Sequence, residues 1–233
     1  LKGGKMSVNL RNNDYKHLYD DSYFQDRNSV DKKRLESFIQ EKKFIHKYVK
    51  EGLICDIGCG TGEFLNYIKW SGDKYGMEIN DSAKEMAKNI GISFEKDILN
   101  QVNFFDVIIF RGTIQHLPNP FSYIQNAYKA LKPGGYIVFL ATPNMNSIYY
   151  KFFNNLPMLS KELNFFIPSD IVLSNVLTNI GFSYVQIEKP YLSSPYASYF
   201  LDHIKFFKKS IFRTSDKFAF WGSSMNVIAR KAP

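Results

Sequence analysis

Short apolar segments alternate along the chain with longer segments in which apolar residues recur every three or four positions. Continuous apolar runs predict buried strands, whereas the longer period predicts helices with one buried face. We therefore expect strands at residues 54–57, 74–80, 92–97, 105–110, 136–142, 183–189 and 225–231. Helices are expected at residues 31–49, 63–70, 81–90, 120–131 and 169–182, with Asp81 capping the third. Alternating strands and helices predict the α/β class and a doubly wound, parallel sheet.

Two long segments, residues 144–168 and 190–224, interrupt this alternation in the C-terminal half. The length of 233 residues suits one large α/β domain. We divide the chain into a helical N-terminal cap or lid, residues 1–50, and a main domain, residues 51–233, which carries both insertions. Long loops in compact domains are usually functional, so we expect the insertions to contact the substrate.

The first strand is followed by a glycine-rich turn with the sequence DIGCGTG, residues 56–62. In an open α/β sheet, ligands bind beyond the carboxyl ends of the strands, where such a turn lies. The glycines follow the pattern GxGxG, which differs from the GxGxxG of dinucleotide-binding turns, and the Lys and Ser or Thr of a P-loop are absent. Asp56 precedes the glycines and would repel a pyrophosphate but attract an ammonium or a sulfonium.

The turn resembles the first motif of class I S-adenosylmethionine-dependent methyltransferases. Other stretches resemble later motifs of this family: Glu78 after the second strand, Asp97 after the third, FDVIIFRGTIQHLPNP (105–120), and ALKPGGYIVFLATPN (130–144). Together they cover roughly residues 50–145. The resemblance implies a mostly parallel, seven-stranded Rossmann-like sheet and S-adenosylmethionine as the cofactor, with S-adenosylhomocysteine as the product. It also implies that Glu78 binds the ribose hydroxyls and that Asp97 meets the adenine amino group.

Each of the predicted cofactor-binding residues also has a purely structural interpretation. The set comprises Asp56, Gly58, Cys59, Gly60, Gly62, Glu78, Ile79, Asp97, Ile98 and Arg111. Asp56 and Glu78 are interpreted as cofactor contacts, whereas Asp97 either meets adenine or caps a helix. Ile79 and Ile98 either line the adenine or belong to the core. Arg111 meets the cofactor carboxylate, an anionic acceptor or a salt-bridge partner.

His116, in the sequence IQHLPNP, is the candidate catalytic residue. A histidine titrates near neutral pH and is able to take a proton from a hydroxyl acceptor. A histidine at this place occurs in methyltransferases with unrelated acceptors. This favours a structural role or a packing contact under the bound cofactor, which we call the shelf. We favour the shelf and keep the general base as the alternative.

The flanking segments supply the candidate acceptor contacts. Tyr19 and Tyr23 lie in a polar, tyrosine-rich segment that is expected to close over the cofactor, and Tyr196 lies in the second insertion. That insertion also contains HIKFFKKSIFR, which is either a basic amphipathic helix on a membrane surface or an extra helix packed on the core.

The acceptor is predicted from a looser resemblance. The layout GF…KPY…SPYA and the closing FWGSSMNVIARK resemble methyltransferases associated with bacterial surface-polysaccharide synthesis. This resemblance implies a sugar acceptor, for example a nucleotide-linked sugar. A quinone or lipid acceptor and a cofactor-binding module without catalysis are the alternatives.

The composition limits which kinds of ligand and partner we expect. The net charge of +8 allows an acidic ligand, but the basic residues are dispersed and no RNA-binding module is recognisable, so we expect no nucleic-acid partner. Cys55 and Cys59, the two cysteines, have a poor spacing for a metal site, and we expect no metal. No apolar run approaches the ~18 residues of a membrane span, and LKGGKMSVNL lacks the apolar region of a secretory signal. We therefore expect a cytoplasmic protein.

Overall fold

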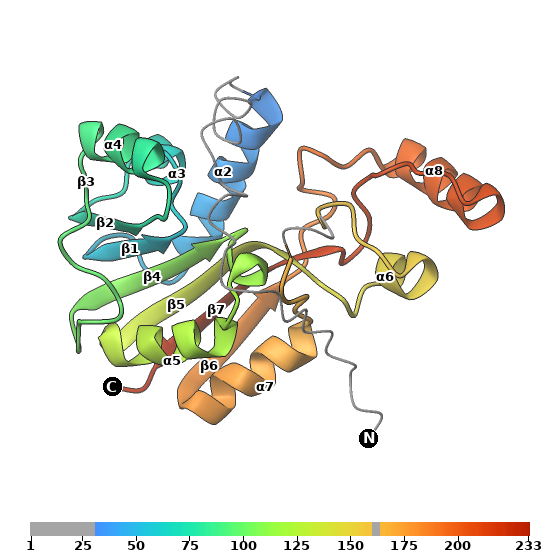
Figure 1. Ribbon diagram of the computed structural model, residues 1–233. Helices are drawn as coiled ribbons and strands as arrows, with labels where there is room; N and C mark the ends of the chain where they lie inside the picture. The colour runs from blue at the N-terminus through green and yellow to red at the C-terminus, as the bar shows by residue number, and fades with distance from the viewer. Residues whose placement is uncertain (1–30, 160–163) are drawn as a thin grey trace.

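A seven-stranded sheet forms the centre of the protein in the computed structural model, which describes residues 31–159 and 164–233 (Figure 1). The strand order is β3-β2-β1-β4-β5-β7-β6. The strands are β1 (Ile54–Ile57), β2 (Lys74–Met77), β3 (Ile92–Ser93), β4 (Phe105–Arg111), β5 (Leu131–Pro143), β6 (Phe182–Glu188) and β7 (Ser224–Lys231). The first five strands pair in parallel, and β7 runs antiparallel to both β5 and β6. This confirms the doubly wound, mostly parallel sheet.

Helices cover both faces of this sheet. The covering helices are α2 (Lys32–Ile45), α3 (Glu63–Tyr67), α4 (Asp81–Asn89), α5 (Pro120–Ala130) and α7 (Asp170–Ile180). The remaining helices of the described residues are α6 (Ile148–Phe153), α8 (Tyr199–Phe212) and a short 3₁₀ helix, η2 (Ile114–His116). Alternate residues of β4 point to opposite faces: Ile108 and Phe110 join the core under α5 and α7, whereas Val107 and Ile109 join the core under α2 and α3. Burial on both faces explains the continuous apolar run of residues 107–110 in β4.

Helix α2 belongs to the second of these cores. Its side chains Phe38, Phe44 and Ile45 are buried together with strand residues of β1 and β4. The part of the predicted N-terminal cap that the structure describes therefore packs directly on the sheet. The predicted lid tyrosines Tyr19 and Tyr23 lie outside the described residues.

Several local expectations were wrong. Helices α2 and α3 and strand β2 end at Ile45, Tyr67 and Met77 rather than at residues 49, 70 and 80, and β5 begins at Leu131 rather than at residue 136. Strand β3 has two residues rather than six, because the side chains of Ser93 and Asp97 accept hydrogen bonds from nearby backbone amides and turn the chain away from β2.

The N-cap of α4 is Asn80, whose side chain accepts from the Ala83 amide at 2.7 Å, and Asp81 is the first helical residue. The side chains of Asn and Asp accept a hydrogen bond from a free backbone N–H of the helix equally well. The sequence alone therefore does not decide whether Asn80 or Asp81 is the N-cap.

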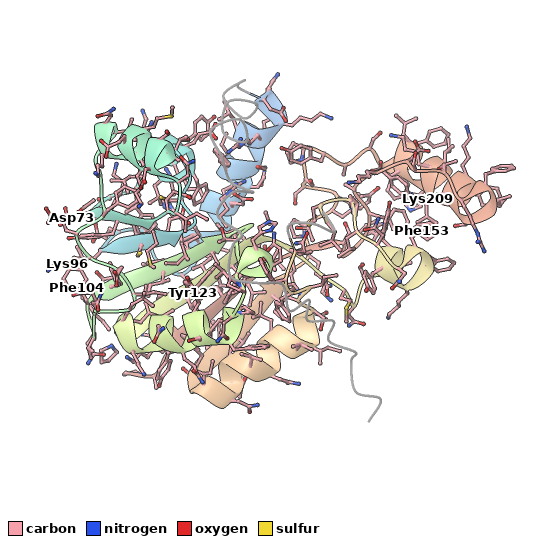
Figure 2. All side chains as sticks on the ribbon, viewed as in Figure 1. Asp73, Lys96, Phe104, Tyr123, Phe153 and Lys209 are labelled. Atoms are coloured by element: carbon pink, nitrogen blue, oxygen red, sulfur yellow. The ribbon has the colours of Figure 1, made fainter. Side chains whose placement is uncertain are left out.

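The two insertions pack against each other rather than on the sheet. Tyr149 and Leu156 from the first insertion form a small core with Phe218 and Phe220 from the second. Figure 1 shows α6 and α8, which belong to these insertions, standing away from the sheet. Figure 2 shows Phe153 of α6 and Lys209 of α8 close together at this contact, where the ammonium lies 5.4 Å from the ring centroid.

Candidate active site

The glycine-rich turn connects β1 to α3 with left-handed backbone conformations. Gly58, Gly60 and Gly62 all have positive φ angles, of 71°, 55° and 77°. A Cβ atom at Gly58 would lie 2.6 Å from a methyl carbon of Thr113, which follows β4, so glycine is required there on two grounds. The amides of Gly58 and Cys59 donate to the Met77 carbonyl, which fastens the turn to the end of β2.

Glu78 holds the turn from the neighbouring strand. One carboxylate oxygen accepts from the Gly60 amide at 2.8 Å, and the other accepts from the amides of Ile79 at 2.7 Å and Asn80 at 3.0 Å. An ionised carboxylate accepts about four hydrogen bonds, so these three leave one acceptor position, on the oxygen that accepts from Gly60. Glu78 is therefore placed to fix the turn and to accept from a ligand as well.

Three adjoining cavities open at the carboxyl ends of the strands. The first, of about 500 Å³, is lined by Glu78 and Ile79 after β2, Asp97 after β3, and residues from Arg111 to Leu117 after β4. The second, of about 200 Å³, shares Gly58, Gly60 and Arg111 with the first. The third, of about 670 Å³, shares Arg111 with both and is otherwise lined mainly by α2 and the second insertion. A ligand that spans the first two cavities would thus end beside the third.

Asp56 is the buried acid of the second cavity. It is 2% exposed, and its Oδ1 has no hydrogen-bond partner in the described part of the chain. Burial raises the pKa of its carboxyl to about 8, although the positive charge of Arg111 opposes the shift. A buried carboxyl with an unused oxygen beside a small cavity fits a cationic ligand group.

Arg111 forms an ion pair that was one of its predicted alternatives. Its Nε donates to Glu41 of α2 at 2.6 Å, and its guanidinium lies 4.3 Å from the ring centroid of Phe38. Both charged side chains of this pair are largely buried. The pair connects α2 to the end of β4 at the point where the three cavities meet.

Of the remaining predicted cofactor-binding residues, the structure places three at the cavities and one in the core. Ile79 and Asp97 line the first cavity, and Asp97 also accepts from the amides of Leu99 and Asn100. Cys59 lines the second cavity, and burial raises the pKa of its thiol. Ile98 is buried in the core under α5 and is not among the described residues that line the first cavity, as its structural interpretation supposed.

His116 lies at the end of η2 and lines the first cavity together with Thr113 and Leu117. Its Nε2 is 3.2 Å from the side-chain nitrogen of Gln115. His116 is not among the described residues that line the third cavity. Its two predicted roles, a shelf under the cofactor and a general base, both stay predictions.

Three residues of the site were missed by the sequence analysis. Arg34 and Glu41 lie on α2, one turn to either side of Phe38, and both line the third cavity, while Thr113 closes over Gly58. Their spacing on α2 is helical, but it does not reveal which strand they face. Tyr196, a predicted acceptor contact, does line the third cavity. In the described ranges, no group of three or more His, Cys, Asp or Glu side chains is arranged to hold a metal ion.

A family model described as a methyltransferase domain matches residues 31–210, more than half of the chain. The chain belongs to this methyltransferase family. This membership agrees with the S-adenosylmethionine-dependent methyltransferase that the glycine-rich turn and the later motifs resemble.

Curated relatives match only part of this methyltransferase. A malonyl-[acyl-carrier protein] O-methyltransferase from Calditerrivibrio nitroreducens is 30% identical over 37% of this chain and 36% of its own length. A ubiquinone biosynthesis O-methyltransferase from Nitrosospira multiformis is 28% identical over 42% of this chain and 46% of its own length. The chain thus spans between a third and a half of the length of these two relatives. They lend no support to the polysaccharide resemblance.

Solved structures share the fold of the methyltransferase over nearly its whole length. A SAM-dependent methyltransferase from Thermotoga maritima has a TM-score of 0.63 at 18% identity and covers 93% of this chain and 98% of its own. Another from Archaeoglobus fulgidus has a TM-score of 0.58 at 21% identity and covers 94% and 100%. At these identities, the likeness establishes the fold alone.

Proposed function

We propose that S-adenosylmethionine spans the first and second cavities, with adenosine in the first and the methionine end in the second. Glu78 would accept from the ribose hydroxyls, Ile79 and His116 would contact the adenosine, and Asp97 would accept from the adenine amino group. The buried carboxyl of Asp56 would face the ammonium of the methionine end. When bound, the cofactor supplies an activated methyl group on a sulfonium that is a ready leaving group.

The acceptor is proposed to bind in the third cavity. The observation that carries this proposal is that Arg111 lines all three cavities, so an acceptor in the third lies next to a methionine end in the second. The protein would contribute orientation of the acceptor atom in line with the methyl group, and exclusion of water from the junction.

The lining of the third cavity favours a small acceptor with a substantial apolar part. It contains aromatic and apolar side chains, including Tyr191, Tyr196, Phe218, Phe220 and Met158. About half of the lining residues are polar: the serines Ser37, Ser193, Ser194, Ser223 and Ser224, the charged Arg34, Glu41, Arg111 and Lys217, and the amides Gln40 and Asn226. A phenol or quinol would lay its flat faces on the aromatic rings and use the polar side chains for its few hydroxyls, whereas a sugar would leave more of the aromatic surface without an apolar partner. We therefore place a phenol-like or quinol-like acceptor ahead of the sugar.

An activity screen tests this proposal. The protein is incubated with S-adenosylmethionine and a panel of catechols, short-chain quinols and nucleotide sugars, and products are searched for a mass gain of one methylene. We expect methylation of phenol or quinol hydroxyls. Methylation of nucleotide sugars alone would overturn the acceptor class, and tight cofactor binding without any product would support the non-catalytic module.

A pair of variants tests where the acceptor binds. Ser194→Trp would fill part of the third cavity, whereas Ser215→Trp adds the same bulk at an exposed position. We expect the first to raise the KM for the acceptor at least tenfold with an unchanged Kd for S-adenosylmethionine, and the second to change neither. An unchanged acceptor KM in Ser194→Trp would remove the acceptor from the third cavity.

A further inference from the structure

Helix α8 presents an apolar stripe to solvent. Phe200, Ile204, Phe207 and Ile211 follow one another at the spacing of a single helix face. Their exposed fractions are 73%, 37%, 67% and 55%. Four large apolar side chains on one exposed face form a continuous patch, and such patches on proteins mark interaction sites.

The opposite face of α8 is the one that packs on the protein. The Phe206 ring stacks on Phe220 with centroids 4.3 Å apart. Asp202 is buried and accepts from the Tyr191 hydroxyl at 3.0 Å and from the Ser198 amide at 2.7 Å. These contacts fix the rotation of the helix, so the apolar stripe is not its core-facing side. The packing explanation considered for this segment therefore accounts for one face only.

The second feature of α8 is its charge. Lys205 and Lys208 are exposed, and Arg213 is exposed directly after the helix. Lys209 donates to the carbonyls of Thr214 and Asp216 instead. Asp202 is the one carboxylate in the sequence of residues 199–213, and it is buried. The solvent face of the helix thus combines apolar side chains with positive charge.

Helix α6 lies against the packed face of α8 and carries an exposed aromatic side chain of its own. Phe152 is exposed, and its ring centroid lies 5.2 Å from that of Phe206. Figure 1 shows both helices at the periphery, away from the sheet, where a flat surface is able to approach them.

We propose that α8 lies on an anionic membrane surface, with Phe200, Ile204, Phe207 and Ile211 inserted among the lipid chains and Lys205 and Lys208 beside the headgroups. Helices that bind membrane interfaces combine an apolar face with flanking lysines in this way, and anionic lipids attract each basic residue near the surface. A second copy of the chain is a poorer occupant, because a two-fold interface would bring the lysines of both copies together. Residues 190–196 and 217–220, which line the third cavity, flank α8 in the sequence. Docking would therefore bring that cavity near the membrane.

Vesicle co-sedimentation of the full chain tests this inference, which does not depend on the identity of the acceptor. The vesicles contain phosphatidylcholine alone, or phosphatidylcholine and phosphatidylglycerol in equal amounts. The apolar variant is Phe207→Ser with Ile211→Ser. Its control, Leu99→Ser with Val102→Ser, changes two exposed apolar residues that lie far from α8 in the sequence.

The charge variant is Lys205→Glu with Lys208→Glu, and its control, Lys43→Glu with Lys50→Glu, reverses two exposed lysines in and after α2. Calorimetric binding of S-adenosylmethionine verifies that each variant is folded.

We expect the wild type and both controls to sediment with the anionic vesicles and at least tenfold less with the neutral ones. Both α8 variants should bind the anionic vesicles at least tenfold more weakly while keeping their affinity for the cofactor. Absence of wild-type binding to either kind of vesicle, or equal binding by the α8 variants, would overturn the inference. A second result would also overturn the inference: the wild type does not bind the vesicles but forms dimers, and the apolar variant is monomeric. A second copy of the chain would then occupy the stripe.

Discussion

Replacement of Glu78 by alanine is expected to weaken binding of S-adenosylmethionine while leaving the fold intact. In the protein, this carboxylate accepts from the Gly60, Ile79 and Asn80 amides, and we propose that it also accepts from the ribose hydroxyls. The substitution therefore removes a ligand contact and a fastening of the glycine-rich turn at once.

The two losses affect different quantities. A hydrogen bond to a charged group contributes ~1.5–3 kcal/mol, so loss of one ribose contact corresponds to roughly 10- to 150-fold in Kd. Loss of the partner of the two partly buried amides, Gly60 and Asn80, costs about 1 kcal/mol of unfolding free energy each, and each such loss lowers the Tm of a domain of this size by about 2–4 °C. The variant should therefore be less stable but still folded, because the unfolding free energy of a domain is typically about 5–15 kcal/mol.

Isothermal titration calorimetry and thermal unfolding measure these two effects. Glu78→Gln keeps one acceptor oxygen and should fall between the wild type and Glu78→Ala. Glu95→Ala removes the same charge from an exposed position after β3 and should bind the cofactor normally. A Kd for Glu78→Ala within twofold of the wild type would show that the ribose does not contact this carboxylate. The positions of adenosine and methionine in the first two cavities would then need revision.

Two further predictions concern Asp56 and His116. Because burial raises the pKa of Asp56 to about 8, its carboxyl is protonated in the free protein below that pH, and an incoming ammonium would favour the carboxylate. Binding of S-adenosylmethionine should then release a proton below about pH 8 and tighten as the pH rises to that value, as calorimetry in buffers of different ionisation enthalpy would reveal. Asp56→Asn should bind weakly and without this pH dependence, and a wild-type affinity that is flat across this range would contradict the assignment. His116→Ala should weaken cofactor binding and keep the pH profile of turnover. A 10²–10⁴-fold loss of turnover together with loss of a titration step would instead make His116 the general base.

The order of strands and helices and the place of the glycine-rich turn followed from the sequence because they depend on local patterns. Apolar runs such as β1 and β4 identify strands, and three glycines after a buried acid identify a turn that exposes its backbone. The ends of weakly paired elements were less predictable. Strand β3 lies at the edge of the sheet, where the Ser93 hydroxyl competes with strand pairing for the Glu95 amide and Asp97 forms a turn with the Leu99 amide.

The tertiary structure alone decided which distant residues meet at the site. Glu41 and Arg111 are seventy residues apart in the chain, and only the packing of α2 on the sheet forms their ion pair. The same holds for α8: its periodicity shows an amphipathic helix, but either face would fit that pattern. Contacts of Asp202 with Tyr191 and of Phe206 with Phe220 set its rotation and leave the apolar stripe exposed. Hydrophobic periodicity predicts that a helix has an apolar and a polar face, whereas the side chains that pack against it in the folded protein determine which face is buried.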